Sequence, residues 1–245
     1  MMLGHVQPSH PIIKSFVFFD LETSALHAED RPKVTELCLI AVHRSSVESS
    51  GTAPRVMDKL TLCVYLNKEI SPTASNLTGL HNALMLDNDK RPLDVQVCES
   101  ICAFLGRQAK PVCMVAHNGY EFDFKLLRTE FDRLGRSLPS DLLCCDSLLA
   151  FRELEGADWQ AFKRPRRSYA LQKMFVRTFG VKPRNVHGAE SDVITLLKLV
   201  LNRGNAVCRW MDEHAKRWTD VQQYYIPKKI EDKIHVEPSS NSPIV

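Results

Sequence analysis

The chain has 245 residues, 44% of them hydrophobic, and a formal net charge of +3. This content can supply the core of one large α/β domain, whereas the small net charge excludes a uniformly basic polymer, so any affinity for nucleic acid needs local clusters of charge. The eight cysteines include no Cys-x-x-Cys pair, and no run of 18 apolar residues occurs. We therefore expect free thiols, a reducing compartment and a protein of the cytoplasm, the nucleus or both, without a signal peptide or membrane span.

Strand patterns dominate the first part of the chain. Segments rich in Val, Leu, Phe or Cys occur at 15–20, 35–44 and 56–66, and polar connectors separate them. Three neighbouring strands predict an antiparallel meander. Helix formers follow at 72–85, and apolar residues at helical spacing predict an amphipathic helix over 93–108.

Helices and strands alternate in the rest of the chain. We expect, in order, a strand at 112–116, a helix at 122–134 that Gly135 ends, a strand at 142–145, a helix at 146–154, a basic loop at 156–167, a helix capped by Ser168 that runs to 179, and helices at 188–202 and 206–217. Strands first and alternation afterwards predict an α/β fold with a mixed β-sheet flanked by helices. We divide the chain into a flexible leader (1–14), one domain (15–218) and a C-terminal tail (219–245) that is disordered toward its end.

Acidic residues follow the strands at positions that predict a metal site. Asp20 and Glu22 end the first strand, and residues two apart in a strand share a face, so these acids would repel each other strongly unless cations neutralised them. Asp123 opens the helix after the fourth strand, and Asp192 lies on a late helix. Four carboxylates, if gathered, form an oxygen site suited to Mg²⁺ or Mn²⁺. His187, five residues before Asp192, would face the metals without being a ligand.

Each of these signals has an ordinary explanation when it is taken alone. An Asp-x-Glu after a strand is more often a turn with solvated acids, and Asp123 would also suit the positive end of its helix. His187 and Asp192 would each be ordinary surface residues. The conjunction of all five residues, in this order and context, favours a shared site.

The order of these residues resembles that of the DEDDh exonucleases, whose five letters Asp20, Glu22, Asp123, His187 and Asp192 match. Segments at 32–44, 54–64, 77–80, 115–119, 167–171 and 187–193 resemble the three-prime repair exonucleases, the TREX family, in particular its short form without a membrane tail. The similarity runs from about Phe16 to Tyr225. It implies a ribonuclease H-like fold, Mg²⁺-dependent removal of nucleotides from DNA 3′ ends, and a homodimer.

The resemblance also assigns roles within the catalytic site. Asp20 would bridge two Mg²⁺ ions, for which Mn²⁺ can substitute, Glu22 and Asp192 would complete the shell of the first ion, and Asp123 would hold the second. His187 would take the proton from the attacking water, a task suited to an imidazole. The product would be a nucleoside 5′-monophosphate.

Substrate contacts follow from the same resemblance. Leu26, Leu77 and Phe122 match the family's apolar contacts to the 3′ end, with ordinary core or loop positions as the alternative for the two leucines. The region of Glu22, Thr23 and Ser24 matches contacts to the terminal sugar, and His117 and Asn118 would order the site.

A basic run, KRPRR at 163–167, stands where the family's short-tailed member has a DNA-binding loop. We expect its cations to contact phosphates; a solvated face or a nuclear-localisation match is the alternative. The four cations are Lys163, Arg164, Arg166 and Arg167.

Two departures from the family pattern stand out. The family's Asp-x-Glu-x-Thr-Gly-Leu is written here with Ser24 and Ala25 in place of Thr and Gly. If that Gly uses a positive φ, Ala25 would be strained or the loop would take another course. The chain also has no proline-rich insertion between its second and third strands and no C-terminal apolar span, so the partner docking and membrane tethering of the long-tailed member are not carried over.

The leading hypothesis is a 3′→5′ exodeoxyribonuclease that acts on single strands and on frayed or mismatched duplex ends in DNA repair or DNA degradation. An exoribonuclease is the first alternative, because other DEDDh enzymes with the same five residues degrade RNA and the choice depends on how the site treats the 2′-hydroxyl. A catalytically inactive nucleic-acid-binding module is the second, and the complete set of five residues argues against it.

Overall fold

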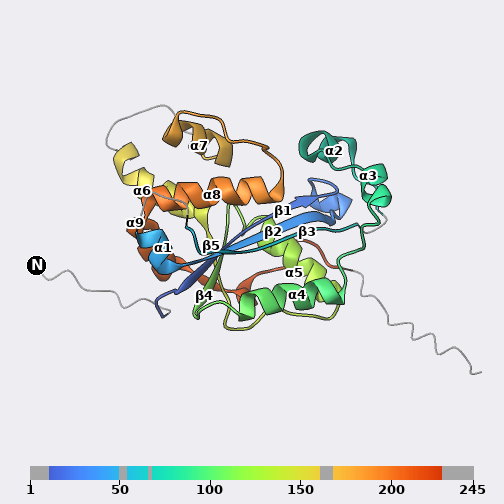
Figure 1. The fold of residues 1–245 in the computed structure, drawn as a ribbon, viewed down its shortest axis with the longest axis horizontal. Helices are drawn as coiled ribbons and strands as arrows, with labels where there is room; N and C mark the ends of the chain where they lie inside the picture. Colours follow the sequence, from blue (N-terminus) through green and yellow to red (C-terminus); the bar gives the residue numbers. More distant parts are fainter. Residues whose placement is uncertain (1–10, 50–53, 66–67, 161–167, 228–245) are drawn as a thin grey trace, which may run out of the picture.

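The computed structural model describes residues 11–49, 54–65, 68–160 and 168–227. Within these ranges six strands form one sheet in the order β3-β2-β1-β4-β5-β6, and helices cover both of its faces (Figure 1). The mixed α/β sheet expected from the sequence is therefore confirmed.

The first three strands form the predicted meander. β1 (Ser15–Thr23) pairs antiparallel with β2 (Val34–His43), which pairs antiparallel with β3 (Asp58–Cys63) at the edge of the sheet. On the other side of β1, β4 (Val112–Ala116) and β5 (Leu143–Asp146) run parallel to it. The two-residue strand β6 (Lys216–Arg217) pairs antiparallel with β5.

The apolar run of β1 is continuous because both faces of this central strand are covered. Phe16 and Phe18 contribute to one core cluster, whereas Val17 and Phe19 contribute to the other. Alternation along the strand directs successive side chains to opposite faces, so a strand between two helical layers has no polar side. The carboxylates of this strand come only beyond Phe19, as Asp20 and Glu22 near its end.

Two helical layers enclose the sheet. Figure 1 shows α1 (Arg44–Glu48), α6 (Ser147–Gln160), α7 (Leu171–Phe179), α8 (Ala189–Arg203) and α9 (Asn205–His214) on one side. On the other side lie α4 (Val95–Gly106) and α5 (Asp123–Arg133). The short helices α2 (Pro72–Thr78) and α3 (Asn82–Asp87) stand beyond the end of the sheet, and single 3₁₀ turns occur at Ala28–Asp30 and Trp218–Asp220.

Three details of the sequence prediction were wrong. α6 continues through Gln160, so the first part of the loop expected at 156–167 is helical. A glycine such as Gly156 reduces the stability of a helix by only about 1 kcal/mol. Its neighbour Glu155 forms ion pairs with Arg177 and Arg203, which hold this part of the helix. Ser168 is not the N-cap of α7, which is Ala170; its Oγ instead accepts the Ala170 N–H at 3.3 Å.

The third difference lies at the end of the domain, where the helix expected over 206–217 stops at His214. The residues Lys216 and Arg217 pair with β5 as β6. A strand of two residues has no periodicity that a sequence could reveal. The five-residue α1, directly after β2, was not expected either.

Chain segments beyond the predicted domain limits also pack onto the fold. Ile13 is fully buried and its N–H donates to Asp212 Oδ1 at 3.0 Å, while the Tyr224 N–H donates to Thr129 Oγ1 at 2.8 Å. The division at 1–14, 15–218 and 219–245 stays a prediction. All eight cysteines lie in the described ranges and are free thiols. Nowhere in those ranges is a helix both long and apolar enough to cross a membrane.

Candidate active site

Three of the predicted acidic residues converge where β1 meets the start of α8. Oxygen atoms from the carboxylates of Asp20, Glu22 and Asp192 all lie within 4.8 Å of one another. Asp20 and Glu22 project from the same side of β1, as their spacing predicted, and Asp192 reaches them from the first turn of α8. Three oxygens at this spacing can share one divalent cation.

The carboxylates are held in an environment that disfavours their charged forms. Burial raises the pKa of Asp20 well above its usual value, and the charges of Asp123, Glu22 and Asp192 add to the effect. Burial, followed by the charges of Asp192 and Glu36, raises the pKa of Glu22 to about 8. A bound dication would reverse this balance because it favours every ionised carboxylate near it.

One oxygen of Asp192 lacks a partner. Its Oδ2 accepts the backbone N–H of His187 at 3.2 Å, but its Oδ1 is buried and has no hydrogen-bond partner in the structure described above. A buried acceptor left unpaired costs about 1–3 kcal/mol, and a cation beside it would remove that cost. The donor set and this unpaired oxygen both fit a divalent metal ion.

Asp123 stands next to this group as the first residue of α5. It is buried, and after burial its charge is the largest of the effects that raise the pKa of Asp20. Burial and the charge of Asp146 raise the pKa of Asp123 itself to about 7, although the backbone N–H of Leu21 donates to its carboxylate and opposes the shift. Asp123 thus lies close to Asp20 but outside the set of three whose oxygens lie within 4.8 Å.

His187 occupies the turn that leads into α8. Its φ of +64° lies in the left-handed region, which a residue other than glycine adopts only when its surroundings hold it there. The hydrogen bond from its backbone to Asp192 is one such restraint, and the bond from Ser191 Oγ to Gly188 O at 2.8 Å is another. None of the residues that the structure describes hydrogen-bonds the imidazole of His187.

Glu36 is a fourth carboxylate at this end of the sheet, and the sequence analysis missed it. It lies opposite Glu22 in the β1–β2 register, and its Oε2 accepts the Ala189 N–H at 2.8 Å. Glu36 therefore holds the first turn of α8, which has no side-chain cap of its own. The sequence signal that could have revealed Glu36 is an acidic residue inside the otherwise apolar run of β2.

Asp146, at the end of β5, was also missed, and it shapes the turn after β4. Its carboxylate accepts the N–H groups of Asn118 at 2.9 Å, Tyr120 at 3.3 Å and Leu148 at 2.9 Å. Asn118 takes a left-handed φ of +65° in this turn. At Gly119 a Cβ would come within 2.6 Å of Ala116 Cβ, so the turn requires glycine there.

His117 is engaged within the protein. Its Nε2 lies 2.8 Å from the carbonyl oxygen of Tyr169 and its Nδ1 lies 2.9 Å from Ser147 Oγ. Burial lowers its pKa, so the ring is neutral, and because a carbonyl only accepts, the proton resides on Nε2. His117 thus joins the end of β4 to the segment before α7, which supports an ordering role, while Asn118 is exposed beside it.

The side chains predicted as apolar contacts are all at least partly exposed. Leu26 is 41% exposed and Leu77 is 40% exposed, so neither is a core residue. Phe122, directly before Asp123, is half-buried. The structure therefore leaves these side chains accessible to a ligand.

The loop after Glu22 is braced through Thr23 and Ser24, whose side chains are buried. Thr23 Oγ1 donates to Ala25 O at 2.7 Å, and Ser24 Oγ accepts the Lys33 N–H at 3.0 Å. Ala25 is not among the residues with positive φ, so the strain considered for it does not arise; in this loop Arg31 takes that conformation, with φ +47°. The loop 163–167, with Lys163, Arg164, Arg166 and Arg167, lies outside the described residues.

Comparisons with known proteins agree with this arrangement. The exonuclease family model RNase_T matches residues 17–200. Three prime repair exonuclease 2 of Mus musculus is 41% identical over 225 residues, which cover 89% of this chain and 95% of that protein.

Two solved structures share the fold at low sequence identity. The nuclease domain of 3′hExo, a DEDDh family member bound to rAMP, has a TM-score of 0.62 at 12% identity over 83% of this chain and 96% of that one. E. coli exonuclease I in complex with a dT13 oligonucleotide has a TM-score of 0.61 at 18% identity over 81% of this chain, which spans 43% of the exonuclease I chain. The family model and the curated relative establish the family: this chain belongs to the exonucleases and, among them, to the three-prime repair exonucleases.

Proposed function

We propose that this chain is a metal-dependent 3′→5′ exodeoxyribonuclease that releases nucleoside 5′-monophosphates from single-stranded DNA and from frayed or mismatched 3′ ends. The observation that carries the proposal is the convergence of Asp20, Glu22 and Asp192, with the buried Asp192 Oδ1 left unpaired. Membership in the three-prime repair exonucleases supports the choice of reaction and of DNA as substrate.

The metal would be held by Asp20, Glu22, Asp192 and, at the start of α5, Asp123. We propose two Mg²⁺ ions, for which Mn²⁺ can substitute, since oxygen ligands suit both cations. Such ions lower the pKa of a bound water and stabilise the leaving oxygen in phosphodiester hydrolysis.

His187 would act as the general base. Its backbone is fixed on Asp192 while its ring has no hydrogen-bond partner in the described part of the chain, so the ring is available to a water beside the acids. The water oxygen forms a bond to phosphorus as the bond from phosphorus to the 3′-oxygen breaks. The proton of the water passes to His187, and the leaving 3′-oxygen takes a proton from solvent.

The protein also supports the site through residues that touch no reacting atom. Glu36 and Asp146 each accept backbone N–H groups, at Ala189 and in the 118–120 turn, and so fix the segments that carry Asp192 and Asp123. Leu26, Leu77 and Phe122 would contact the unstacked bases at the 3′ end, and the backbone near Glu22 and Thr23 the terminal sugar. The hydroxyl and N–H of Ser24 hydrogen-bond the backbone of Lys33, and its carbonyl accepts the N–H of Ser71. These bonds favour a structural role for Ser24, in which it stabilises the loop.

An exoribonuclease is the second candidate, because the DEDDh structure with the same fold is bound to a ribonucleotide, rAMP. Matched DNA and RNA oligonucleotides, labelled at one end and digested in parallel with Mg²⁺ or with EDTA, separate the two. We expect stepwise shortening of the DNA from its 3′ end, slower loss of the RNA, and no cleavage by Asp20→Ala. Faster digestion of RNA would favour the second candidate, and equal activity of Asp20→Ala would contradict both.

The basic loop at 163–167 would add phosphate contacts. Replacing Lys163, Arg164, Arg166 and Arg167 with Ala should weaken DNA binding and flatten its dependence on salt, while turnover at saturating DNA is largely kept. An unchanged affinity would remove this assignment.

A homodimer is the assembly we propose, with β3 as its seam. This strand lies at the edge of the sheet, where its free backbone groups can pair with a second copy. Light scattering should then give twice the chain mass of 27.9 kDa, and the monomer mass would contradict it.

We further propose that the protein works in a reducing compartment, the cytoplasm or the nucleus. The eight free thiols support this location.

A further inference from the structure

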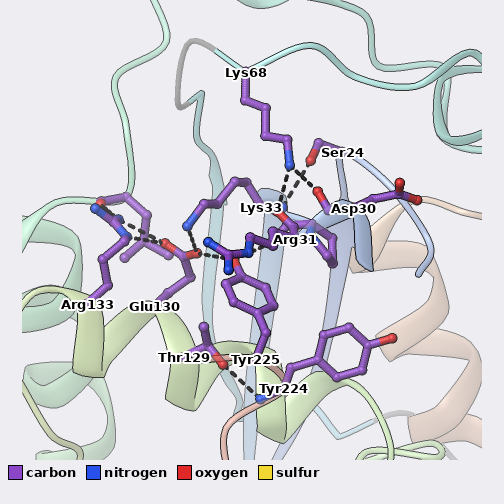
Figure 2. Close-up of polar contacts among 12 residues, drawn as sticks. Ser24, Asp30, Arg31, Lys33, Lys68, Thr129, Glu130, Arg133, Tyr224 and Tyr225 are labelled. Carbon is purple, nitrogen blue, oxygen red and sulfur yellow. Dashed lines mark hydrogen bonds and ion pairs between the residues drawn. The ribbon is translucent and has the colours of Figure 1, made fainter. Parts of the chain in front are cut away.

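The chain after β6 passes along α5 and brings residues 221–227 beside the loop that carries Leu26. We call residues 221–227 the C-terminal strap. Its backbone is fixed on α5, because the Tyr224 N–H lies 2.8 Å from Thr129 Oγ1 and 3.1 Å from Lys125 O. Figure 2 shows the strap with the loop above it: Tyr225 rises toward Arg31 and Lys33, whereas the ring of Tyr224 extends to the other side.

Tyr225 anchors the far end of the loop. Its hydroxyl donates to Pro32 O at 2.8 Å, and Lys33 Nζ lies 5.5 Å from the centre of its ring (Figure 2). Lys33 also pairs at 2.8 Å with Glu130, which is fully buried on α5 and pairs with Arg133 as well. Because the charges are both paired and buried, this end of the loop is held firmly.

Tyr224 contacts two residues to which we assign contacts with the substrate, Phe122 and Leu26. Its ring packs edge-on against the ring of Phe122, with centroids 5.2 Å apart. Its hydroxyl lies 3.4 Å from the carbonyl oxygen of Leu26. Phe122 directly precedes Asp123, and Leu26 comes four residues after Glu22, so Tyr224 bridges the segment that leads into Asp123 and the loop that follows Glu22.

We propose that Tyr224 is a positioning residue that holds Leu26 and Phe122 as one apolar wall for the 3′-terminal nucleotide. The inference rests on the proposed function, since it assumes that this wall receives nucleic acid. Fixing both parts of the wall before binding lowers the entropy lost when the nucleotide docks, so Tyr224 strengthens binding. Among the described residues Tyr224 contacts Phe122, Leu26, Tyr225 and α5 and none of the three acids, so we assign it to positioning and not to the chemical step.

The test compares three variants of the full chain by steady-state digestion of a single-stranded DNA oligonucleotide. Tyr224→Leu removes the aromatic contact with Phe122 and should raise KM about threefold to tenfold, with kcat changed by less than about twofold. Tyr224→Phe keeps the ring contact with Phe122 and loses only the long, exposed hydrogen bond to Leu26 O, so its KM should rise by no more than about twofold. Gln223→Ala, the matched control, removes the hydrogen bond from the same strap to Asp132 of α5, which does not involve the loop of Leu26, and should leave KM at the wild-type value.

Binding without turnover provides an independent measurement. The anisotropy of the same oligonucleotide, labelled with a fluorophore, is measured with Ca²⁺ in place of Mg²⁺, and Tyr224→Leu should weaken binding by the same factor that it raises KM. Unchanged binding by Tyr224→Leu would overturn the inference even if digestion of DNA stands, as would an equal loss in Gln223→Ala. A wild-type protein that binds but never cleaves would contradict the proposed function alone, and one that does neither would overturn both.

Discussion

At the scale of single residues, Asp192 connects the two acids of β1 with the turn that carries His187. Its position on α8 brings one oxygen to Asp20 and Glu22, its Oδ2 fixes the His187 backbone, and its Oδ1 is buried without a hydrogen bond in the chain as described. On the proposed function, a side chain in this position would link the metal site to the general base. The two proposed functions can still be separated by mutation, because only the imidazole of His187 would move a proton.

Replacing His187 with Ala should lower kcat by about 10²–10⁴-fold, the usual contribution of a positioned base, and leave binding of metal and DNA intact. The expected binding is unchanged because alanine retains the backbone N–H that donates to Asp192. The measurement combines kcat for a DNA oligonucleotide with its Kd in Ca²⁺.

The matched control is His43→Ala, which removes an exposed imidazole at the opposite end of β2. Its kcat should equal that of the wild type. Turnover of His187→Ala within about threefold of the wild type would remove the assigned role, since the loss of a base is larger than that.

Because the imidazole of His117 is buried and neutral, we predict that the free energy of unfolding depends on pH. Burial, with the charge of Arg152, lowers its pKa below the usual value of 6.5, although Tyr169 O and the charge of Asp146 oppose the shift. Since the pKa is lower in the folded state, the contribution of the neutral ring is complete above pH 6.5 and is lost as the pH falls below 6.5 toward the folded-state pKa.

The measurement is the free energy of unfolding in denaturant between pH 7.5 and 5.5 for the wild type and for His117→Asn. The wild type should lose up to about 1.4 kcal/mol per pH unit more than the variant over this range. Parallel pH profiles of the two proteins would show that His117 is not held neutral.

At the scale of elements, Glu36 fixes the start of α8 from β2. It replaces the N-terminal cap that the sequence of α8 lacks, across 153 positions of chain. Glu36→Ala should therefore lower the free energy of unfolding by about 1–3 kcal/mol, because the Ala189 N–H loses its acceptor. Glu36→Gln keeps an oxygen acceptor and should lose clearly less.

Denaturant titrations of both variants with EDTA present measure the effect apart from metal binding. A Glu36→Ala protein as stable as the wild type would show that the bond from Ala189 does not hold α8. Equal losses in the Ala and Gln variants would show that the charge of Glu36, rather than its oxygen acceptor, is what matters.

Much of the element order could be predicted because periodicity and stop signals are local. The meander, α4, β4 and α5 follow from apolar spacing, and the acids at the ends of β1 and on α8 follow from a motif. β6 and the extension of α6 depend on tertiary contacts, so they leave no local signal. Glu36, Asp146 and Tyr224 act through backbone groups or rings far away in the chain, and such partners become visible only once the fold places them together.

At the scale of the whole molecule, the fold gathers at one end of the sheet carboxylates that lie far apart in the chain. Asp20 and Asp192 are separated by most of the domain, yet their oxygens lie within 4.8 Å of each other. Burial raises the pKa values of Asp20, Glu22, Asp123 and Asp192, and the charges of neighbouring acids raise those of Asp20 and Glu22 further. The architecture thus concentrates negative charge that a divalent ion would neutralise.

Anomalous diffraction from crystals soaked in millimolar Mn²⁺ tests this claim most directly, because it locates the ion and its ligands without relying on activity. We predict anomalous peaks bonded to Asp20 and shared with Glu22 and Asp192, a further peak near Asp123, and loss of the shared peak in Asp20→Ala. Crystals in which no manganese contacts Asp20 and Asp192 jointly would contradict the account.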